Sequence, residues 1–195
     1  MGLGAYRRKR TFSKTTEPKG KQELPKKIKS HLFVVQKHDA SHLHYDFRMA
    51  IGKALKSWAI PKGPTNSTKS KRLAILTEDH PMEYANFEGI IPKGNYGAGV
   101  VMVWDKGSYK NLKKDKAGKE MPIEDCFKKG RIEIFLKGKK MKGAYALVRF
   151  RGKNWLMVKM KDDYANSGPD LVKTHVRSVK SNRTMHEIKK SSKES

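Results

Sequence analysis

The sequence predicts an all-β fold with minor helix, built as a single antiparallel β-barrel. Seven segments between residues 31 and 160 are short, rich in β-branched and aromatic residues, and bounded by glycine or charged turns. No long amphipathic helix competes with them. Strands also do not alternate with helices, as they would in a doubly wound nucleotide-binding fold. So many short strands in one chain favour an antiparallel barrel or sandwich.

The predicted strands follow one another at short intervals. Strands 31–37 and 42–49 are joined by a polar turn, and the second alternates apolar and polar residues strictly. Residues 122–129 predict a short helix. The glycine-rich stretch 92–99 lacks the Lys-Ser/Thr ending of a phosphate-binding loop, so it predicts turns or bulges between strands. The remaining strands are the apolar or aromatic segments 73–77, 99–104, 131–136, 144–150 and 155–160.

The chain is strongly basic, with 44 Lys and Arg against 19 Asp and Glu and a formal net charge of +25. Such a charge indicates a polyanionic partner, either nucleic acid or an acidic membrane surface. Residues 31–160 carry +14 of it, so most of the excess lies on the part expected to fold. We therefore divide the chain into a basic, partly disordered arm (1–30), a barrel domain (31–161) and a polar C-terminal tail (162–195).

Three features argue against a secreted or membrane protein. The longest uncharged run, 94–104, has 11 residues, whereas a spanning helix needs about 20. The start of the sequence has no apolar stretch typical of a signal peptide. Cys126 is the single cysteine, which excludes an internal disulfide and a cysteine-based metal knuckle. These features predict an intracellular, cytoplasmic protein. The polar row described next gives the positive charge a phosphate-binding centre, so no membrane partner is expected.

The predicted strand 42–49 carries the strongest functional signal. Its polar face is a row of two His, one Asp and one Arg, opposite an apolar face. Imidazole nitrogens and a carboxylate oxygen together suit Mn, Zn or Fe, and a neighbouring guanidinium can grip phosphate oxygens. A hairpin would return His38 towards this row. The candidate metal ligands are His38, His44 and Asp46, with Arg48 beside them and His42 compatible by parity alone.

A second polar group, residues 78–84, follows an apolar strand, so its side chains emerge at a strand end. His80 suits a proton donor or a cation against phosphate. Tyr84 can donate a hydrogen bond to the same oxyanion. Two further candidate phosphate-binding cations are Lys62, projected by a rigid Pro-Lys-Gly-Pro turn, and Arg72.

Four motifs resemble the phosphoesterase domain of bacterial DNA ligase D. They are HDASHLHYDFR (38–48), WAIPKGP (58–64), EDHPMEY (78–84) and FEGIIPKGNYGAG (87–99). The segments 139–149 and 155–159 are also similar to that domain, so the resemblance runs from about residue 6 to 161. No ligase or polymerase domain fits in 195 residues, so the stand-alone form of the domain is expected.

The resemblance implies a Mn-dependent enzyme, with other divalent transition metals possible, that heals 3′ ends. Such an enzyme removes a 3′-terminal ribonucleoside and then the 3′-phosphate from a DNA or RNA primer strand. The resemblance implies His38, His44 and Asp46 as metal ligands, Arg48, His80 and Tyr84 as contacts to the scissile phosphate, and Lys62, Arg72 and Glu78 as further positions needed for activity. In the arm, Arg10 and Glu17 match a substrate-binding segment expected to order over the active site, and Thr11 replaces its usual Asp.

The resemblance also implies the partners. The substrate would be a DNA or RNA/DNA 3′ end in a primer–template, near the nucleoid, with a separate DNA ligase, polymerase and end-binding protein as possible partners. Two other function classes stay open: a non-catalytic basic barrel that binds nucleic acid, and a 2-His-1-carboxylate iron oxygenase. The first would expose aromatics for base stacking, and the second leaves the phosphate-seeking cations unexplained. The sequence predicts no oligomeric state.

Overall fold

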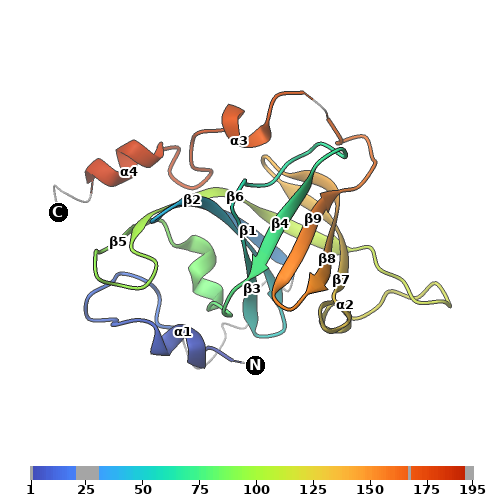
Figure 1. Cartoon of the computed structure of the whole chain (residues 1–195), viewed down its shortest axis with the longest axis horizontal. Helices are drawn as coiled ribbons and strands as arrows, with labels where there is room; N and C mark the ends of the chain where they lie inside the picture. Colours follow the sequence, from blue (N-terminus) through green and yellow to red (C-terminus); the bar gives the residue numbers. More distant parts are fainter. Residues whose placement is uncertain (1, 21–30, 167, 192–195) are drawn as a thin grey trace.

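The computed structural model describes residues 2–20, 31–166 and 168–191, and these fold mainly as antiparallel sheet (Figure 1). The strands are β1 Leu32–Asp39, β2 Leu43–Ile51, β3 Ala54–Ile60, β4 Lys71–Leu76, β5 Gly89–Ile91, β6 Gly99–Asn111, β7 Arg131–Gly138, β8 Lys142–Arg151 and β9 Asn154–Lys159. The helices are α1 Gly4–Arg8, the 3-10 helix η1 Met82–Asn86, α2 Ile123–Lys129, α3 Leu171–Thr174 and α4 Met185–Ser191. No helix in the described ranges is long and apolar enough to cross a membrane.

Eight of the described strands close into a barrel, which confirms the predicted fold class. Their order is β1-β2-β3-β4-β9-β8-β7-β6, and β6 pairs back with β1. Strand β6 makes this closure because it is long. Its first part lies between β1 and the short strand β5, and its last part pairs with β7. The predicted short helix is confirmed as α2.

Strands β3 and β5 are absent from the prediction. The turn predicted at Pro61–Pro64 directly follows β3, and Trp58, in the same motif, lies inside β3. Strand β3 does not alternate in polarity, since Lys56 and Ser57 are buried beside apolar residues. Strand β5 has three residues, too few to show a period.

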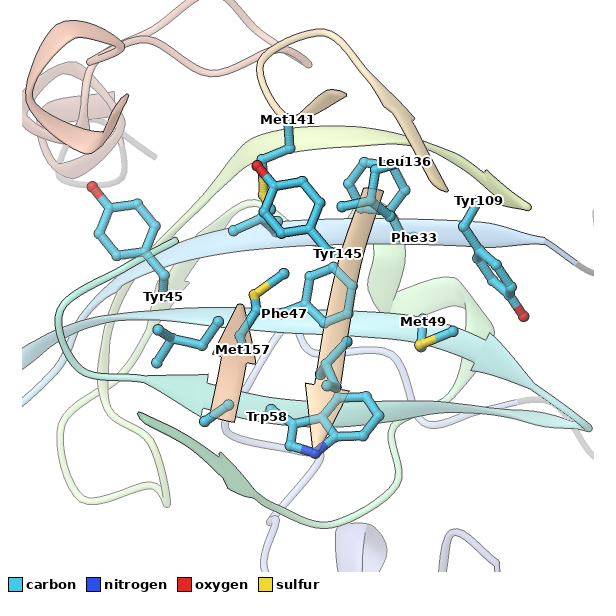
Figure 2. Close-up of a cluster of buried hydrophobic side chains, with 14 of the residues drawn as sticks. Phe33, Tyr45, Phe47, Met49, Trp58, Tyr109, Leu136, Met141, Tyr145 and Met157 are labelled. Carbon is cyan, nitrogen blue, oxygen red and sulfur yellow. The ribbon is translucent and has the colours of Figure 1, made fainter. Parts of the chain in front are cut away.

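The wall formed by β1, β2 and β6 is buried on both sides. Inside the barrel, Tyr45, Phe47 and Met49 of β2 point into a core that includes Trp58 and Met157 (Figure 2). Outside it, a second apolar cluster joins the same wall to α1 and η1, and it comprises Tyr6, Val34, Ala50, Leu55, Met82, Tyr84, Ala85, Phe87, Ile91, Val101 and Val103. The polar face of β2 therefore also faces protein rather than open solvent.

The terminal segments pack on this outer wall and on the barrel. Tyr6 in α1 is fully buried, and its hydroxyl donates to the carbonyl of Pro18 at 2.6 Å. In the segment expected to be a polar tail, Leu171 and Ile188 are buried against the core. Asp170 caps α3 by accepting from the amide of Val172. Residues 21–30 and 192–195 of the predicted terminal segments lie outside the described residues.

Candidate metal and phosphate-binding site

The polar row of β2 lies on the outer wall of the barrel. His44, Asp46 and Arg48 alternate with the core residues Tyr45 and Phe47, so burial of the latter pair turns the row outward. Strand β1 pairs with β2 so that His38 and His44 are direct partners, with ring centroids 4.8 Å apart. The hairpin thus brings His38 to the row, as the sequence predicts.

Two backbone carbonyls fix the imidazoles of this group. The Nε2 of His38 donates to the carbonyl of Gly97, and the Nδ1 of His44 donates to the carbonyl of His42, both at 2.9 Å. In a neutral imidazole the other nitrogen then carries the lone pair. Those nitrogens, Nδ1 of His38 and Nε2 of His44, lie 3.6 and 3.7 Å from the carboxylate oxygens of Asp46.

This geometry fits a metal ion. One ligand atom from each of His38, His44 and Asp46 lies within 4.8 Å of the others. Burial alone would raise the pKa of Asp46, but the charge of Arg48 and the contacts with the two imidazoles hold this pKa well below its usual range. The group thus offers two nitrogen lone pairs and one carboxylate anion, which is a donor set for Mn, Zn or Fe. It could hold a metal ion.

Arg48 is held rigidly beside this group. Its Nη2 donates to Asp46 Oδ2 at 2.9 Å, and its Nε donates to Gln36 Oε1 at 2.7 Å. The amide of Gln36 in turn donates to the carbonyls of Tyr84 and Phe87. Arg48 is 3% exposed. A buried guanidinium with this many fixed contacts is preorganised for an anion.

His80 reaches the site on a segment that runs beside β3. Its backbone exchanges two hydrogen bonds with Leu55 at 2.9 and 3.0 Å. Nη1 of Arg48 lies 3.0 Å from its Nδ1, and Nη2 of Arg10 lies 3.4 Å from its Nε2. Burial, followed by the charges of Arg48 and Arg10, lowers the pKa of His80 well below 6.5. His80 is therefore neutral in the resting protein at pH 7.

The N-terminal arm supplies a second guanidinium. Arg10 pairs with the buried Glu17 at 2.8 Å and with Glu78 at 3.2 Å, and Lys9 pairs with Glu78 at 3.0 Å. The hydroxyl of Tyr84 donates to the same oxygen of Glu17 that Arg10 binds, at 3.0 Å. A chain of charged contacts thus joins the arm to η1 and to the segment that carries His80.

These side chains surround a cavity of about 320 Å³. Its lining includes most of the predicted site residues, namely Arg10, His38, His44, Asp46, Arg48, Glu78, His80 and Tyr84. Glu17 is 3% exposed and lies behind Arg10. Lys62 is exposed on the turn after β3, and Arg72 lies 3.4 Å from Asp170. Neither of these two cations is among the described residues that line the cavity.

Several residues of the site were not predicted. Gln36 could have been found from the sequence. It is a polar residue in an otherwise apolar stretch of β1, and it lies on the same face of the strand as His38. Gly97, Tyr96 and Thr77 line the cavity through loop and strand-end positions. Tyr96 and Gly97 lie in a stretch predicted as turns and Thr77 ends a predicted strand, so only the folded structure places them at the site.

The fold and site together define a class of protein: a β-barrel whose outer wall could hold a metal ion beside a fixed guanidinium and a neutral imidazole. A family model described as the DNA ligase D 3′-phosphoesterase domain matches residues 36–149. The chain therefore belongs to the DNA ligase D 3′-phosphoesterase domain family.

Curated relatives agree with this family. The chain is 46% identical over 191 residues to the multifunctional non-homologous end joining protein LigD of Pseudomonas aeruginosa. The matched region covers 94% of the chain and 22% of that protein. It is 45% identical to the protein of the same name from Mycolicibacterium smegmatis, covering 86% of the chain and 22% of the relative. It is 42% identical to the LigD protein of Mycobacterium tuberculosis, and the match covers 82% of the chain and 20% of that relative. The chain thus spans about a fifth of the length of these relatives.

Proposed function

We propose that this chain is a Mn-dependent 3′-end-healing enzyme of DNA end joining. It would remove a 3′-terminal ribonucleoside, and then the 3′-phosphate, from a primer strand in a primer–template. One observation carries the proposal: the lone pairs of His38 and His44 are aimed at Asp46 by backbone carbonyls, directly beside the buried Arg48. The same arrangement leaves the iron oxygenase unsupported, because the cavity beside the group is lined by two guanidinium groups.

The metal would be held by His38, His44 and Asp46, and it would supply positive charge and Lewis acidity to a phosphate oxygen. Arg48 and Arg10 would donate to the remaining oxygens of that phosphate, since both line the cavity. Asp46 accepts from Nη2 of Arg48, so the same carboxylate that holds the guanidinium would also hold the metal. Mn is proposed rather than Zn or Fe because the resemblance to the family implies it.

His80 would hold a proton only when a phosphate is bound. In the resting protein burial, helped by the charges of two guanidinium groups, lowers the pKa of His80 and keeps it neutral. A dianionic phosphate between Arg48 and Arg10 offsets their charge, which raises the pKa of His80 and favours its protonated form. The imidazolium can then give its proton to the leaving oxygen or stabilise the transition state. Tyr84 would turn its hydroxyl from Glu17 towards the same phosphate.

The remaining predicted residues would act around the cavity. Glu78 lies between Lys9 and Arg10 and so positions both cations of the arm. Lys62 and Arg72 lie outside the cavity lining, so we assign them contacts with parts of the strand beyond the scissile phosphate. A separate ligase, polymerase and end-binding protein would act on the healed end in the cytoplasm, at the nucleoid.

The test uses primer–templates that end in a 3′-ribonucleotide or a 3′-phosphate, with added Mn or with chelator. We expect Mn-dependent release of the nucleoside and of phosphate. His44→Ala and Asp46→Ala should each reduce the rate by about 100-fold or more, because each removes a ligand of the metal that would stabilise the transition state. His42→Ala is the matched control, because His42 contributes its backbone carbonyl to the group. Full activity of the His44 and Asp46 variants would refute the assignment.

A further inference from the structure

A second cavity on the outer wall is surrounded by lysines from three distant parts of the chain. Its volume is about 250 Å³, and it is lined by Lys106 of β6, Lys139 of the β7–β8 turn and Lys180 before α4, together with Asn86, Val103 and Val179. Convergence of three ammonium groups on one hollow is unfavourable unless something offsets their charge. This cavity is separate from the one that holds the His-His-Asp group.

The three ammonium groups bind neutral oxygens in the described part of the chain. Lys180 donates to the carbonyl of Asn86 at 2.7 Å, Lys106 donates to the side-chain oxygen of Asn86, and Lys139 lies 3.5 Å from the carbonyl of Val179. No carboxylate lies within 4 Å of any of the three among the described residues. Because an ammonium group has three donors, each lysine keeps donors for a further acceptor.

Carboxylates in the adjoining segments are already engaged elsewhere. Asp105 accepts from the amides of residues 139–141, and Glu88 accepts from the amide of Val103 and the hydroxyl of Ser178. Burial and the charge of Lys180 lower the pKa of Lys106. Both observations describe a site with uncompensated positive charge, which a bound anion would relieve.

The two cavities are joined by one short helix. Tyr84 lines the first cavity and Asn86 lines the second, and both belong to η1. Their Cα atoms can be at most about 7.6 Å apart, since consecutive Cα atoms are about 3.8 Å apart. A nucleic-acid strand that ends in the first cavity therefore has only a few nucleotides to cover before it reaches the lysines.

We propose that Lys106, Lys139 and Lys180 bind a backbone phosphate of the strand whose 3′ end occupies the first cavity, a few nucleotides upstream of that end. The proposal rests on the proposed function, which supplies the strand. Lysine suits this task because its ammonium is a point charge that binds phosphate without demanding one orientation. Such a contact would set the position of the strand and leave its base sequence unread.

The experiment compares the triple variant Lys106→Gln, Lys139→Gln and Lys180→Gln with a control that loses the same charge. The control replaces Lys116, Lys119 and Lys129, which are exposed on the loop after β6 and on α2, at the far end of the molecule from α1 and α4 (Figure 1). Both variants are made in the full chain. Binding of 3′-phosphate oligonucleotides of increasing length is measured by fluorescence anisotropy over a range of salt concentrations, and turnover is measured separately.

For the wild-type chain and the control, affinity should rise stepwise once the oligonucleotide is long enough to reach the lysines. The triple variant should lose this step, and its slope of log affinity against log salt should fall by about 0.7 to 0.9 for each phosphate contact removed. Inorganic phosphate is tested as a competitor in the same measurement. If it binds at the lysines while the affinity for oligonucleotides shows no stepwise rise with length, the site takes small anions and the proposal is wrong. Equal salt slopes in the triple variant and the control would also overturn it. Absence of 3′-end turnover in the wild-type chain as well would instead refute the proposed function.

Discussion

At the residue scale, a glycine carbonyl controls the direction of a histidine lone pair. Gly97 has a φ of +76°, a conformation that L side chains rarely adopt. Its carbonyl accepts from Nε2 of His38, and a Cβ built on it would lie 3.6 Å from Cε1 of the same ring. The glycine-rich stretch therefore consists of turns, as predicted, and one of its turns also orients a candidate metal ligand.

This role can be separated from the conformational effect of the glycine. Gly97→Ala and Gly94→Ala both place alanine at a positive φ, and each should destabilise the protein by about 1 kcal/mol. Only Gly97→Ala should weaken metal binding, by about 10-fold or more, because strain at this positive φ displaces the carbonyl that accepts from His38. Metal titration calorimetry and thermal unfolding check the two effects. Equal metal affinities in the two variants would contradict the role of the carbonyl.

The neutral state of His80 predicts a pH dependence of stability. Its pKa is lowered in the folded protein, so between that value and about 6.5 the unfolded chain binds the extra proton. Stability contributed by this group is complete above pH 6.5 and is lost as the pH falls below it, by up to about 1.4 kcal/mol per pH unit. Urea unfolding with chelator present, from pH 7.5 to 5.5, should show a smaller loss for His80→Gln than for the unaltered chain. Parallel curves would show that His80 titrates normally.

At the element scale, the sequence predicts strands whose two faces meet different environments. Strand β2 is readable because its inner face packs in the core and its outer face carries the polar row. Strand β3 is not, because Ser57 on its outer face is buried under the segment that carries His80, and Lys56 on the opposite face is buried as well. For the same reason, the part of the site that lies on the outer face of β2 could be predicted from the alternation of the sequence. Contacts of Gly97 and of the arm depend on tertiary packing, which no local pattern encodes.

The arm is an element held by one buried carboxylate. Glu17 accepts from Arg10 at 2.8 Å and from the Tyr84 hydroxyl at 3.0 Å. Glu17→Gln removes the charge and should lower the free energy of local opening of the arm by about 2 kcal/mol. Amide hydrogen exchange of residues 4–18 should then quicken by about 30-fold, while exchange in the barrel stays unchanged. Glu120→Gln on an exposed loop is the control, and unchanged exchange in the arm would contradict this account.

At the scale of the whole molecule, the fold has two apolar layers that share one wall. The barrel interior is one layer, and the cluster between the wall, α1 and η1 is the other. The candidate site lies at the edge of the outer layer, so its side chains are held by a sheet that cannot move away without opening both layers. This arrangement explains how so many charged groups stay buried in fixed positions.

The barrel interior should dominate global stability. Trp155 is fully buried, with its ring centroid 5.5 Å from that of Trp58 and 5.7 Å from that of Phe127. Trp155→Ala should reduce the free energy of unfolding by about 3–5 kcal/mol. Phe150→Ala, on the same sheet but 57% exposed, should change it by less than about 0.5 kcal/mol. Urea denaturation of the two variants measures the difference, and equal values would show that the interior is not the main source of stability.

Because His38 pairs directly with His44, the candidate metal site forms only when β1 and β2 pair in the native register. Side chains alternate along a strand, so a slip of one residue between β1 and β2 would turn His38 to the opposite face of the sheet. Only the native alignment brings three ligands together. A metal ion bound there would stabilise that alignment and no shifted one. Metal binding would therefore favour the native register of the β1–β2 hairpin during folding, before any substrate binds.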